Sequence, residues 1–489
     1  MARFVTVEHP PSLADYAAVG HLTTAVQQLR QAADAAASRL RGRTVWMVNS
    51  TAKGGGVAEM LPGKVQLLRD LGIRTEWVVI ESERPEFFEL TKHIHNLVHG
   101  SGEPRLGEAE RELFEGVNRA NAEWFASVLK PGDVLVVHDP QPLPLGPQLA
   151  DQLALRTIWR CHIGLDEENA STRAAWAFLE PYARAYSHAV FSAPEYIPPF
   201  LADRSTVIHP GVDPLASKNR DMHLHELVRV LANSALTSPI GPVLRPPFSD
   251  LANRLQPGGE FRPAIWPEEI GLLSRPIVTQ VSRWDRLKGF EPLLRAFAQL
   301  KQVARTDGSR FSAQHRRRLD IARLVLAGPM ASDVADDPEA REVLAELARV
   351  WLGLEPFVQS DIAVVTLPMH APRENALMVN ALQRASSMVV QNSLREGFGL
   401  TVTEAMWKRI PVLTNTRACG PRQQVRDGID GRLVADPENV DELAAVLIDM
   451  LADPDRVDAW GRAAQRRVHE NFLIFTQLRG WLDVLGRVA

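Results

Sequence analysis

Two series of short apolar runs, each run followed by a helical pattern, most constrain how this 489-residue chain can fold. The runs lie at 44–49, 76–80, 133–138, 157–162, 189–193 and 206–209, and then at 276–282, 323–328, 362–367, 388–391, 411–415 and 432–435. Between them, apolar residues recur at spacings of three and four, which is typical of amphipathic helices. Strands that alternate with helices form parallel sheets covered on both faces. The sequence therefore predicts an α/β protein with two doubly wound parallel-sheet domains.

The two series also predict the domain boundaries. We expect an N-terminal domain at 1–213, an interdomain insertion or lid at 214–275, a C-terminal domain at 276–470 and a last helix at 471–489. The segment 214–275 is rich in proline and glycine, so a partly disordered linker is the alternative there. Because ligands bind at the carboxyl ends of parallel strands, the two domains are expected to face each other across a cleft.

Composition narrows the class of protein. With 45% hydrophobic and 23% charged residues, the chain has the composition of an ordinary globular protein. Its net charge of −4 and its lack of long basic runs argue against a nucleic-acid partner. Two cysteines make no disulfide framework, which favours a reducing compartment. With no signal-like start and no apolar run of about 18 residues, we expect no membrane partner and a cytoplasmic protein.

Two carboxylates eight positions apart form the most informative motif. Glu396 stands in a glycine-bearing loop, and Glu404 stands on the helix that follows. Backbone N–H groups of Phe398, Gly399 and Leu400 lie at the predicted helix start, where the positive end of the helix dipole favours an anion. The motif predicts a cradle for a sugar and a phosphate.

Two strand-to-helix turns are further candidates for phosphate binding. Arg283 ends a strand and Lys288 stands at the next helix, so an Arg fork and a Lys point charge can clamp a diphosphate. Two solvated surface charges are the alternative. In the glycine run 54–56, Gly55 and Gly56 can bring backbone N–H groups close to a diphosphate because they lack a Cβ. A simple tight turn explains these glycines equally well.

Two histidines, His138 and His162, end strands in the predicted N-terminal domain. A single histidine at a strand end is usually structural, but two that face a cleft are candidates for sugar contacts. The other closely spaced histidines lack a completing cysteine or acid, so we predict no metal site. These are His93, His95, His99, His223 and His225.

Together the motifs resemble the family-4 retaining glycosyltransferases with the GT-B fold, and among them the trehalose synthases that join an NDP-glucose to glucose. The resemblance covers nearly the whole chain. The runs that carry it, beside the two-glutamate motif, are 54–61, 137–143, 159–163, 209–215 and 391–393. Residues 216–275 depart from that subgroup by their length. The resemblance implies a GT-B fold of two Rossmann-like domains facing across a cleft, with the last helix crossing back onto the first domain.

The resemblance also implies roles on the donor side. Arg283 and Lys288 would hold the diphosphate and neutralise its charge as it leaves. Glu404 would bind the ribose hydroxyls, Glu396 the hydroxyls of the donor glucose, and His162 the donor sugar near its reacting carbon. Backbone groups would contact the sugar and phosphates at five positions, namely Gly55, Gly56, Phe398, Gly399 and Leu400.

On the acceptor side, the resemblance assigns His138, Asp139 and Gln141. It implies a retaining enzyme that makes trehalose reversibly from glucose and UDP-, ADP- or GDP-glucose, with the base left open. We expect no tightly bound cofactor, only small-molecule substrates and a homodimer, and the sequence leaves stimulation by Mg²⁺ open.

Three alternatives to this function stay open from the sequence. They are a trehalose phosphorylase that uses inorganic phosphate, a transferase with another acceptor, and a scaffold that binds sugar nucleotides without catalysis. The complete set of Arg283, Lys288, Glu396, Glu404 and His162 favours catalysis.

Overall fold

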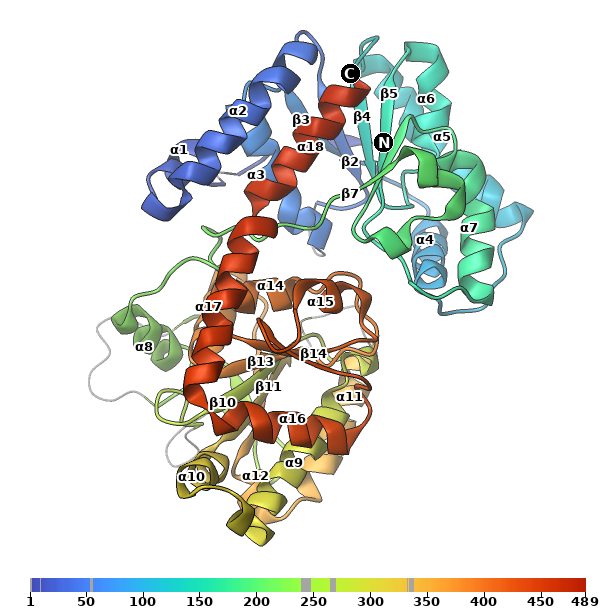
Figure 1. Cartoon of the computed structure of the whole chain (residues 1–489). Coiled ribbons are helices and arrows are strands. Elements are labelled where there is room, and N and C mark those ends of the chain that lie inside the picture. Colours follow the sequence, from blue (N-terminus) through green and yellow to red (C-terminus); the bar gives the residue numbers. More distant parts are fainter. Residues whose placement is uncertain are drawn as a thin grey trace. The chain divides into compact units, whose positions relative to one another are not determined.

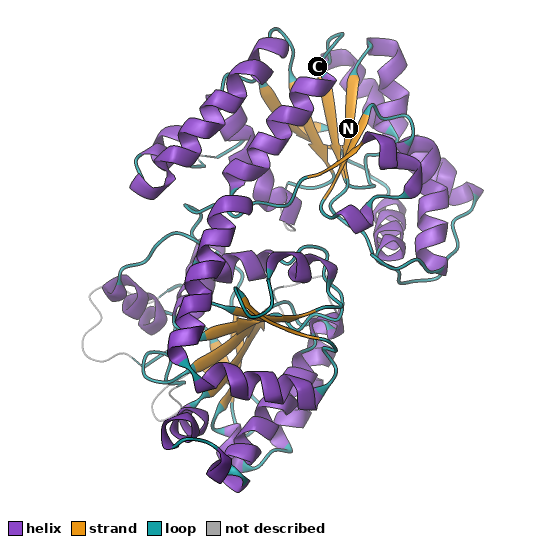
Figure 2. Ribbon diagram, in the orientation of Figure 1, coloured by secondary structure: helices purple, strands orange, loops and turns teal. Residues whose placement is uncertain are grey.

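The computed structural model describes residues 2–8, 10–52, 56–238, 248–263, 270–331, 333 and 338–489. The chain divides into two compact units, here called unit 1 (Met1–Gly211 and Leu473–Ala489) and unit 2 (Val212–Phe472). Each unit holds one sheet flanked by helices, drawn in orange and purple in Figure 2. The functional roles predicted for the two domains stay a prediction.

Unit 1 contains a seven-stranded sheet with the strand order β1-β3-β2-β4-β5-β6-β7 (Figure 1). Its strands are parallel except β1, which pairs antiparallel with β3 at one edge. The strands are β1 (Arg3–Phe4), β2 (Val45–Asn49), β3 (Thr75–Val79), β4 (Val134–His138), β5 (Arg156–Arg160), β6 (His188–Phe191) and β7 (Ser205–Val207). This sheet confirms the first series of apolar runs.

Helices flank the sheet of unit 1, and every residue of β2 and β4 is buried. This burial explains why these strands consist almost wholly of apolar residues. The helices are α1 (Leu13–Ala17), α2 (Thr23–Arg39), α3 (Gly56–Asp70), α4 (Pro85–Val98), α5 (Glu108–Val128), α6 (Leu145–Leu153), α7 (Ala170–Ala183) and α18 (Ile474–Val488), with 3₁₀ turns η1 (Gly20–Leu22), η2 (Pro194–Tyr196) and η3 (Pro199–Arg204).

The C-terminal helix α18 packs alongside α2 within unit 1, as the red and blue ribbons in Figure 1 show. Arg39 donates to the carbonyl of Gly486 and Arg43 to that of Ala489, each at 2.7 Å. Cations favour the carboxyl end of a helix, where carbonyl groups lack partners within the helix. The last helix is therefore an integral part of unit 1.

Unit 2 contains an eight-stranded sheet with the strand order β15-β14-β13-β10-β11-β12-β8-β9. The strands are β8 (Asn253–Leu255), β9 (Phe261–Pro263), β10 (Ile277–Val281), β11 (Arg323–Pro329), β12 (Ile362–Leu367), β13 (Met388–Val390), β14 (Val412–Asn415) and β15 (Gly431–Val434). The six from β10 to β15 pair in parallel and confirm the second predicted series.

Helices also flank the sheet of unit 2 (Figure 2). They are α8 (Leu224–Asn233), α9 (Phe290–Thr306), α10 (Ala313–Ile321), α11 (Pro338–Leu352), α12 (Pro356–Gln359), α13 (Pro372–Arg384), α14 (Leu400–Trp407), α15 (Cys419–Gln424), α16 (Val440–Ala452) and α17 (Pro454–Asn471), with 3₁₀ turns η4 (Arg286–Lys288) and η5 (Gly308–Arg310). None of the described helices is both long and apolar enough to cross a membrane.

The segment between the two predicted domains contributes elements to unit 2. Strand β8 pairs antiparallel with β12, and β9 pairs antiparallel with β8, so the two strands extend the second sheet at its edge. Helix α8 packs against α13. Residues 239–247 and 264–269 of this segment lie outside the described part of the chain. Whether the segment also acts as a lid stays a prediction.

Candidate active site

Two loops meet at the carboxyl-end edge of the sheet in unit 2. Strands β10 and β13 are parallel neighbours, so the turn at 282–289 and the loop at 391–399 leave the sheet side by side. Gln280 joins the two loops through both ends of its amide. Its Nε2 donates to the carbonyl of Lys288 at 2.7 Å, and its Oε1 accepts from the backbone N–H of Asn392 at 3.2 Å. These bonds fix the turn against the loop.

A glycine and a tryptophan shape the turn after β10. Gly289 has a φ of +61°, and a Cβ placed there would lie only 2.2 Å from the carbonyl oxygen of Asn392. A side chain at this position would therefore push the turn away from the loop. At the base of the turn, Trp284 packs on Phe290 with ring centroids 4.8 Å apart and donates to the carbonyl of Pro329 at 2.7 Å.

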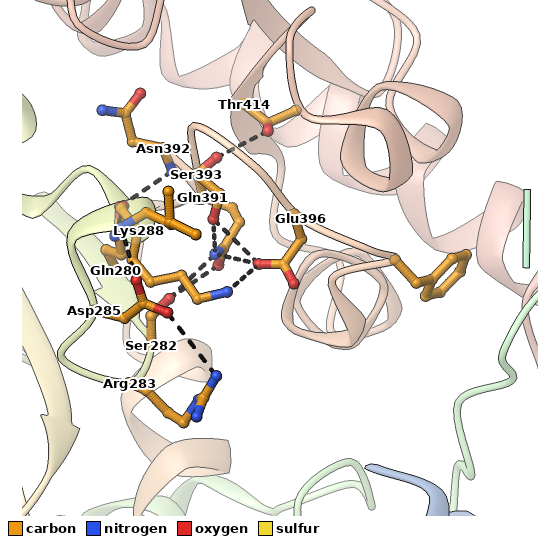
Figure 3. Close-up of polar contacts among 12 residues, drawn as sticks. Gln280, Ser282, Arg283, Asp285, Lys288, Gln391, Asn392, Ser393, Glu396 and Thr414 are labelled. Atoms are coloured by element: carbon orange, nitrogen blue, oxygen red, sulfur yellow. Dashed lines mark hydrogen bonds and ion pairs between the residues drawn. The ribbon is translucent and has the colours of Figure 1, made fainter. Parts of the chain in front are cut away.

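Lys288 and Glu396 form an ion pair between the turn and the loop (Figure 3). Lys288 Nζ lies 2.7 Å from Glu396 Oε2, and the two side chains are only 13% and 17% exposed. The same carboxylate oxygen accepts from Ser393 Oγ at 3.1 Å and from Gln391 Nε2 at 3.4 Å. Three donors therefore orient the Glu396 carboxylate.

The surroundings of Glu396 keep it ionised. Burial raises the pKa of a carboxyl group, but the charge of Lys288 and the hydrogen bonds from Lys288 and Ser393 outweigh burial here. The positive charge of Arg283 acts in the same direction. The pKa of Glu396 consequently lies below its ordinary value, so the group is a carboxylate at neutral pH.

Arg283 stands apart from this ion pair. Its side chain is 66% exposed, and its Nη2 lies 3.9 Å from Asp285 Oδ2 (Figure 3). Asp285 also accepts from the N–H of Leu287 at 2.8 Å, which caps η4. An exposed ion pair this long holds its partners weakly, so the Arg283 guanidinium can turn toward a ligand.

The segment after Glu396 forms the predicted helix start, because α14 begins at Leu400. Gly399 precedes it with a φ of +79°, in the left-handed region. Gln424 donates to the carbonyl of Phe398, and the N–H of Gly420 donates to the carbonyl of Glu396 at 3.3 Å. The backbone of the glycine-bearing loop is thus anchored on α15 while its N–H groups stand at the positive end of α14.

Glu404 lies on α14, and its side chain is largely buried. A cation that the sequence reasoning missed, Lys218, places its Nζ 3.8 Å from Glu404 Oε1. Lys218 lies between β7 and α8 in a stretch with no regular pattern, so only the fold brings it to Glu404.

In unit 1, His138 and His162 lie side by side at the ends of neighbouring strands β4 and β5. Their rings are nearly parallel, and His138 Nδ1 lies 3.1 Å from His162 Nε2. Asp139 follows with a φ of +62°, and its Oδ1 accepts from the backbone N–H of His162 at 2.8 Å. The structure therefore brings these three predicted residues together.

Burial shifts the pKa values of His138, Asp139 and His162. It lowers the pKa of both histidines well below the ordinary value, and the nearby charges of Arg160 and Lys64 act in the same direction. Burial also raises the pKa of Asp139 to about 6, although the N–H of His162 and the charge of Arg160 oppose it. Both imidazoles are therefore neutral at pH 7, which fits a hydrogen bond in which one ring donates and the other accepts.

Lys64 and Trp481 are neighbours of the histidines that the sequence reasoning missed. Lys64 is 1% exposed, and its Nζ lies 4.8 Å from the ring centroid of Trp481 on α18, a ring that also lies 6.4 Å from that of His138. Burial lowers the pKa of Lys64 to about 7. The helical spacing from Leu61 places Lys64 on the buried face of α3, a signal that its polar character obscured.

The remaining predicted residues, Gln141, Gly55 and Gly56, have few or no described side-chain contacts. Gln141 is partly buried, and its carbonyl accepts from Asn118 Nδ2 at 3.1 Å. Gly56 begins α3, and a Cβ placed there would meet no described atom within 4 Å. Gly55 lies outside the described residues, so its predicted role stays a prediction. No three His, Cys, Asp or Glu side chains in the described ranges gather as a metal site would require.

Two family models match this chain. Residues 47–198 match the model "Trehalose synthase, N-terminal domain", and residues 371–467 match "Glycosyl transferases group 1". A trehalose synthase of Pyrococcus horikoshii is 34% identical over 461 residues, which cover 93% of this chain and 92% of that protein. A trehalose phosphorylase of Pleurotus sajor-caju is 26% identical over 432 residues, which cover 83% of this chain and 52% of that protein.

Solved structures of other proteins share the fold of this chain. An α,α-trehalose-phosphate synthase (UDP-forming) from Burkholderia vietnamiensis superposes with a TM-score of 0.64 at 17% identity, covering 91% of this chain and 99% of the other. This likeness confirms the predicted GT-B fold with two Rossmann-like units.

Proposed function

Because the chain belongs to the trehalose synthase family of GT-B glycosyltransferases, we propose that it transfers a glucosyl group from a nucleoside diphosphate glucose to glucose, with retention of configuration. The product is trehalose, and the reaction is reversible. That the chain is a glycosyltransferase of trehalose-related chemistry follows from its relatives. The donor and the acceptor are the proposed part.

The Lys288–Glu396 ion pair is the observation that carries this proposal. Breaking the anomeric C–O bond leaves an oxocarbenium-like sugar and puts negative charge on the departing diphosphate. A fixed ammonium at Lys288 and an exposed guanidinium at Arg283 would stabilise that charge, and preorganised charges of this kind lower a barrier without a metal or a protein nucleophile. The Glu396 carboxylate would accept hydrogen bonds from the hydroxyls of the donor glucose.

Retention follows if the acceptor attacks from the face that the diphosphate leaves. The acceptor oxygen forms a bond to the anomeric carbon while the bond to the phosphate oxygen breaks, and the acceptor proton passes to that phosphate oxygen. The N–H groups from Phe398 to Leu400 would hold the sugar and phosphate during this exchange. Water must be kept out, because hydrolysis is the competing reaction.

In unit 1, His162 suits a sugar hydroxyl through Nδ1, because its Nε2 lies 3.1 Å from His138 Nδ1, while His138 Nε2 lies 3.5 Å from Met47 Sδ. A neutral imidazole can donate from one nitrogen and accept at the other, as a hydroxyl can. We assign His162 to the donor sugar near its reacting carbon. His138, Asp139 and Gln141 are assigned to the acceptor, and Gly55 and Gly56 to backbone contacts with the phosphates.

A phosphorylase reaction is the second candidate, and the likeness to trehalose phosphorylases supports it. The cations at Arg283 and Lys288 would serve inorganic phosphate as well as a diphosphate. The chain spans about half the length of those relatives. A glutamate at 404 suited to ribose hydroxyls favours the nucleotide reaction.

The test incubates purified protein with glucose and UDP-, ADP- or GDP-glucose, each with and without Mg²⁺, and measures disaccharide and released nucleotide. Parallel reactions contain trehalose with either a nucleoside diphosphate or inorganic phosphate. We expect nucleotide-dependent trehalose formation, and its reversal by the matching diphosphate.

Glucose 1-phosphate formed from trehalose and phosphate alone would assign the chain to the phosphorylases instead. Binding of a nucleotide sugar without disaccharide formation would contradict glucose as the acceptor. The Lys92→Met variant should give the same products as wild type in every reaction, because Lys92 is an exposed residue of α4 outside the proposed site.

A further inference from the structure

A lysine outside the proposed mechanism contacts the carboxylate at 404. Lys218 Nζ lies 3.8 Å from Glu404 Oε1, with the lysine side chain 33% exposed and the glutamate side chain 10% exposed. Both residues belong to unit 2, and 186 positions separate them along the chain. Since Glu404 is assigned to the nucleotide ribose, the cation beside it bears on nucleotide binding.

Side chains of α13 hold the backbone on both sides of Lys218 by hydrogen bonds. The buried Asn380 donates through Nδ2 to the carbonyl of Ser217 at 3.0 Å and to that of Arg220 at 2.9 Å. Arg384 donates to the same Arg220 carbonyl at 3.1 Å. Backbone carbonyls on both sides of Lys218 are therefore fixed, so its Cα has a defined position.

Asn219, the residue next to Lys218, links the same stretch to α14. Lys408 is buried, and its Nζ donates to Asn219 Oδ1 at 3.2 Å and to the carbonyl of Glu404 at 3.0 Å. The Lys408 amino group thus links the side chain of Asn219 to the backbone of Glu404. These two bonds of Lys408 fix the backbone near Lys218 relative to Glu404. A lysine on a mobile surface loop would lack such bonds.

The positive charge of Lys218 stabilises and orients the Glu404 carboxylate. A carboxylate as buried as Glu404 loses hydration, and a cation within about 4 Å compensates for part of that loss. At 3.8 Å the Lys218 ammonium attracts Oε1 by its charge, and water screens this attraction less than that of Arg283 for Asp285 because both side chains are less exposed. The attraction favours orientations of the carboxylate that turn Oε1 toward Lys218. A preset carboxylate binds a diol with less loss of conformational freedom than a mobile one.

We propose that Lys218 is a positioning residue of the nucleotide site, where it holds the Glu404 carboxylate to accept the ribose hydroxyls of a nucleoside diphosphate. This inference rests on the function proposed above. It assigns the stretch at 213–223 to donor recognition.

The test measures the dissociation constants of a nucleoside diphosphate and of inorganic pyrophosphate by calorimetry. The proteins are wild type, Lys218→Met, Lys218→Arg, Glu404→Gln and the double variant Lys218→Met/Glu404→Gln. Lys218→Met should weaken nucleoside diphosphate binding by about tenfold, the coupling expected for contacting charged groups. Pyrophosphate lacks a ribose, so its affinity should not change.

Two further results separate positioning from general damage. Lys218→Arg should restore most of the affinity, and Lys218→Met should add little to the loss that Glu404→Gln already causes. An unchanged affinity in Lys218→Met, an equal loss for pyrophosphate, or independent losses in the double variant would overturn the role of Lys218. A wild-type protein that binds no nucleoside diphosphate would overturn the proposed function and this role together.

Discussion

Lys288 neutralises the largely buried Glu396 carboxylate and stands where the diphosphate is proposed to leave. We expect Lys288→Met to lower kcat for glucosyl transfer by about 100- to 1000-fold, the effect of removing one preorganised group from a developing charge. Single-turnover assays at saturating donor would measure this loss.

The same substitution leaves Glu396 buried without its cation, so folding must be checked by circular dichroism. Lys288→Arg keeps the charge and should retain more activity than Lys288→Met. A loss of less than about tenfold in Lys288→Met would contradict the role at the leaving group.

Lys64 should make the stability of the protein depend on pH. Its pKa is lowered from 10.5 to about 7 in the folded protein, so between these values the unfolded chain binds a proton that the folded chain lacks. Stability contributed by this residue therefore rises as the pH increases from about 7 to about 10. We expect Lys64→Met to be more stable than wild type near pH 7, with a difference that shrinks toward pH 10.

Urea unfolding of both proteins at several pH values would measure that difference, in which the other titrating groups largely cancel. Lys92→Met serves as the control, since its lysine is exposed. A constant difference across the pH range would show that Lys64 keeps an ordinary pKa.

At the scale of elements, the turn between β10 and α9 depends on one glycine. Gly289→Ala would have a strained φ of +61° and a Cβ 2.2 Å from the Asn392 carbonyl oxygen. Gly428→Ala is a matched control, because its φ is +69° and a Cβ there meets nothing within 4 Å. We expect about 1–2 kcal/mol of destabilisation from the backbone in both variants, and about 1–3 kcal/mol more from the clash in Gly289→Ala.

Thermal unfolding and donor binding would separate these effects. Because the clash displaces the turn that carries Lys288, only Gly289→Ala should also weaken donor binding. Equal behaviour of the two variants would mean that the loop after β13 yields to the added methyl group.

Elements buried on both faces were predictable, and those exposed or built of polar residues were not. The runs that form β2 and β4 are almost wholly apolar because helices cover them. Strand β9 includes the exposed Arg262 and carries no such signal, so the sequence predicts only an insertion or linker for its segment. Likewise the motif with Glu396 was recognisable, whereas Lys64 and Lys218 resemble surface lysines until the fold brings them to their partners.

At the scale of the whole molecule, unit 1 is built from two distant parts of the chain. Helix α18 buries Trp481 and Leu478, and its Phe475 packs edge-on against Tyr16 of α1 with ring centroids 5.2 Å apart. We expect removal of residues 473–489 to expose the apolar face of α2 and to lower hydrogen-exchange protection there by at least about tenfold, because local opening follows the loss of buried contacts.

Hydrogen exchange followed by mass spectrometry would test this, with the strands of unit 2 as the internal control. Those strands draw their contacts from 212–472 and should keep their protection. Undiminished protection in α2 would show that unit 1 is stable without its last helix.

The discontinuous make-up of unit 1 also sets an order of events during synthesis. A ribosome makes the chain from its amino end, so every residue of unit 2 is joined before α18 emerges. Unit 2 can complete its core while the apolar face of α2 still waits for its cover. That surface therefore stays uncovered until α18 has been made, and the docking of α18 completes unit 1 and places Trp481 beside His138.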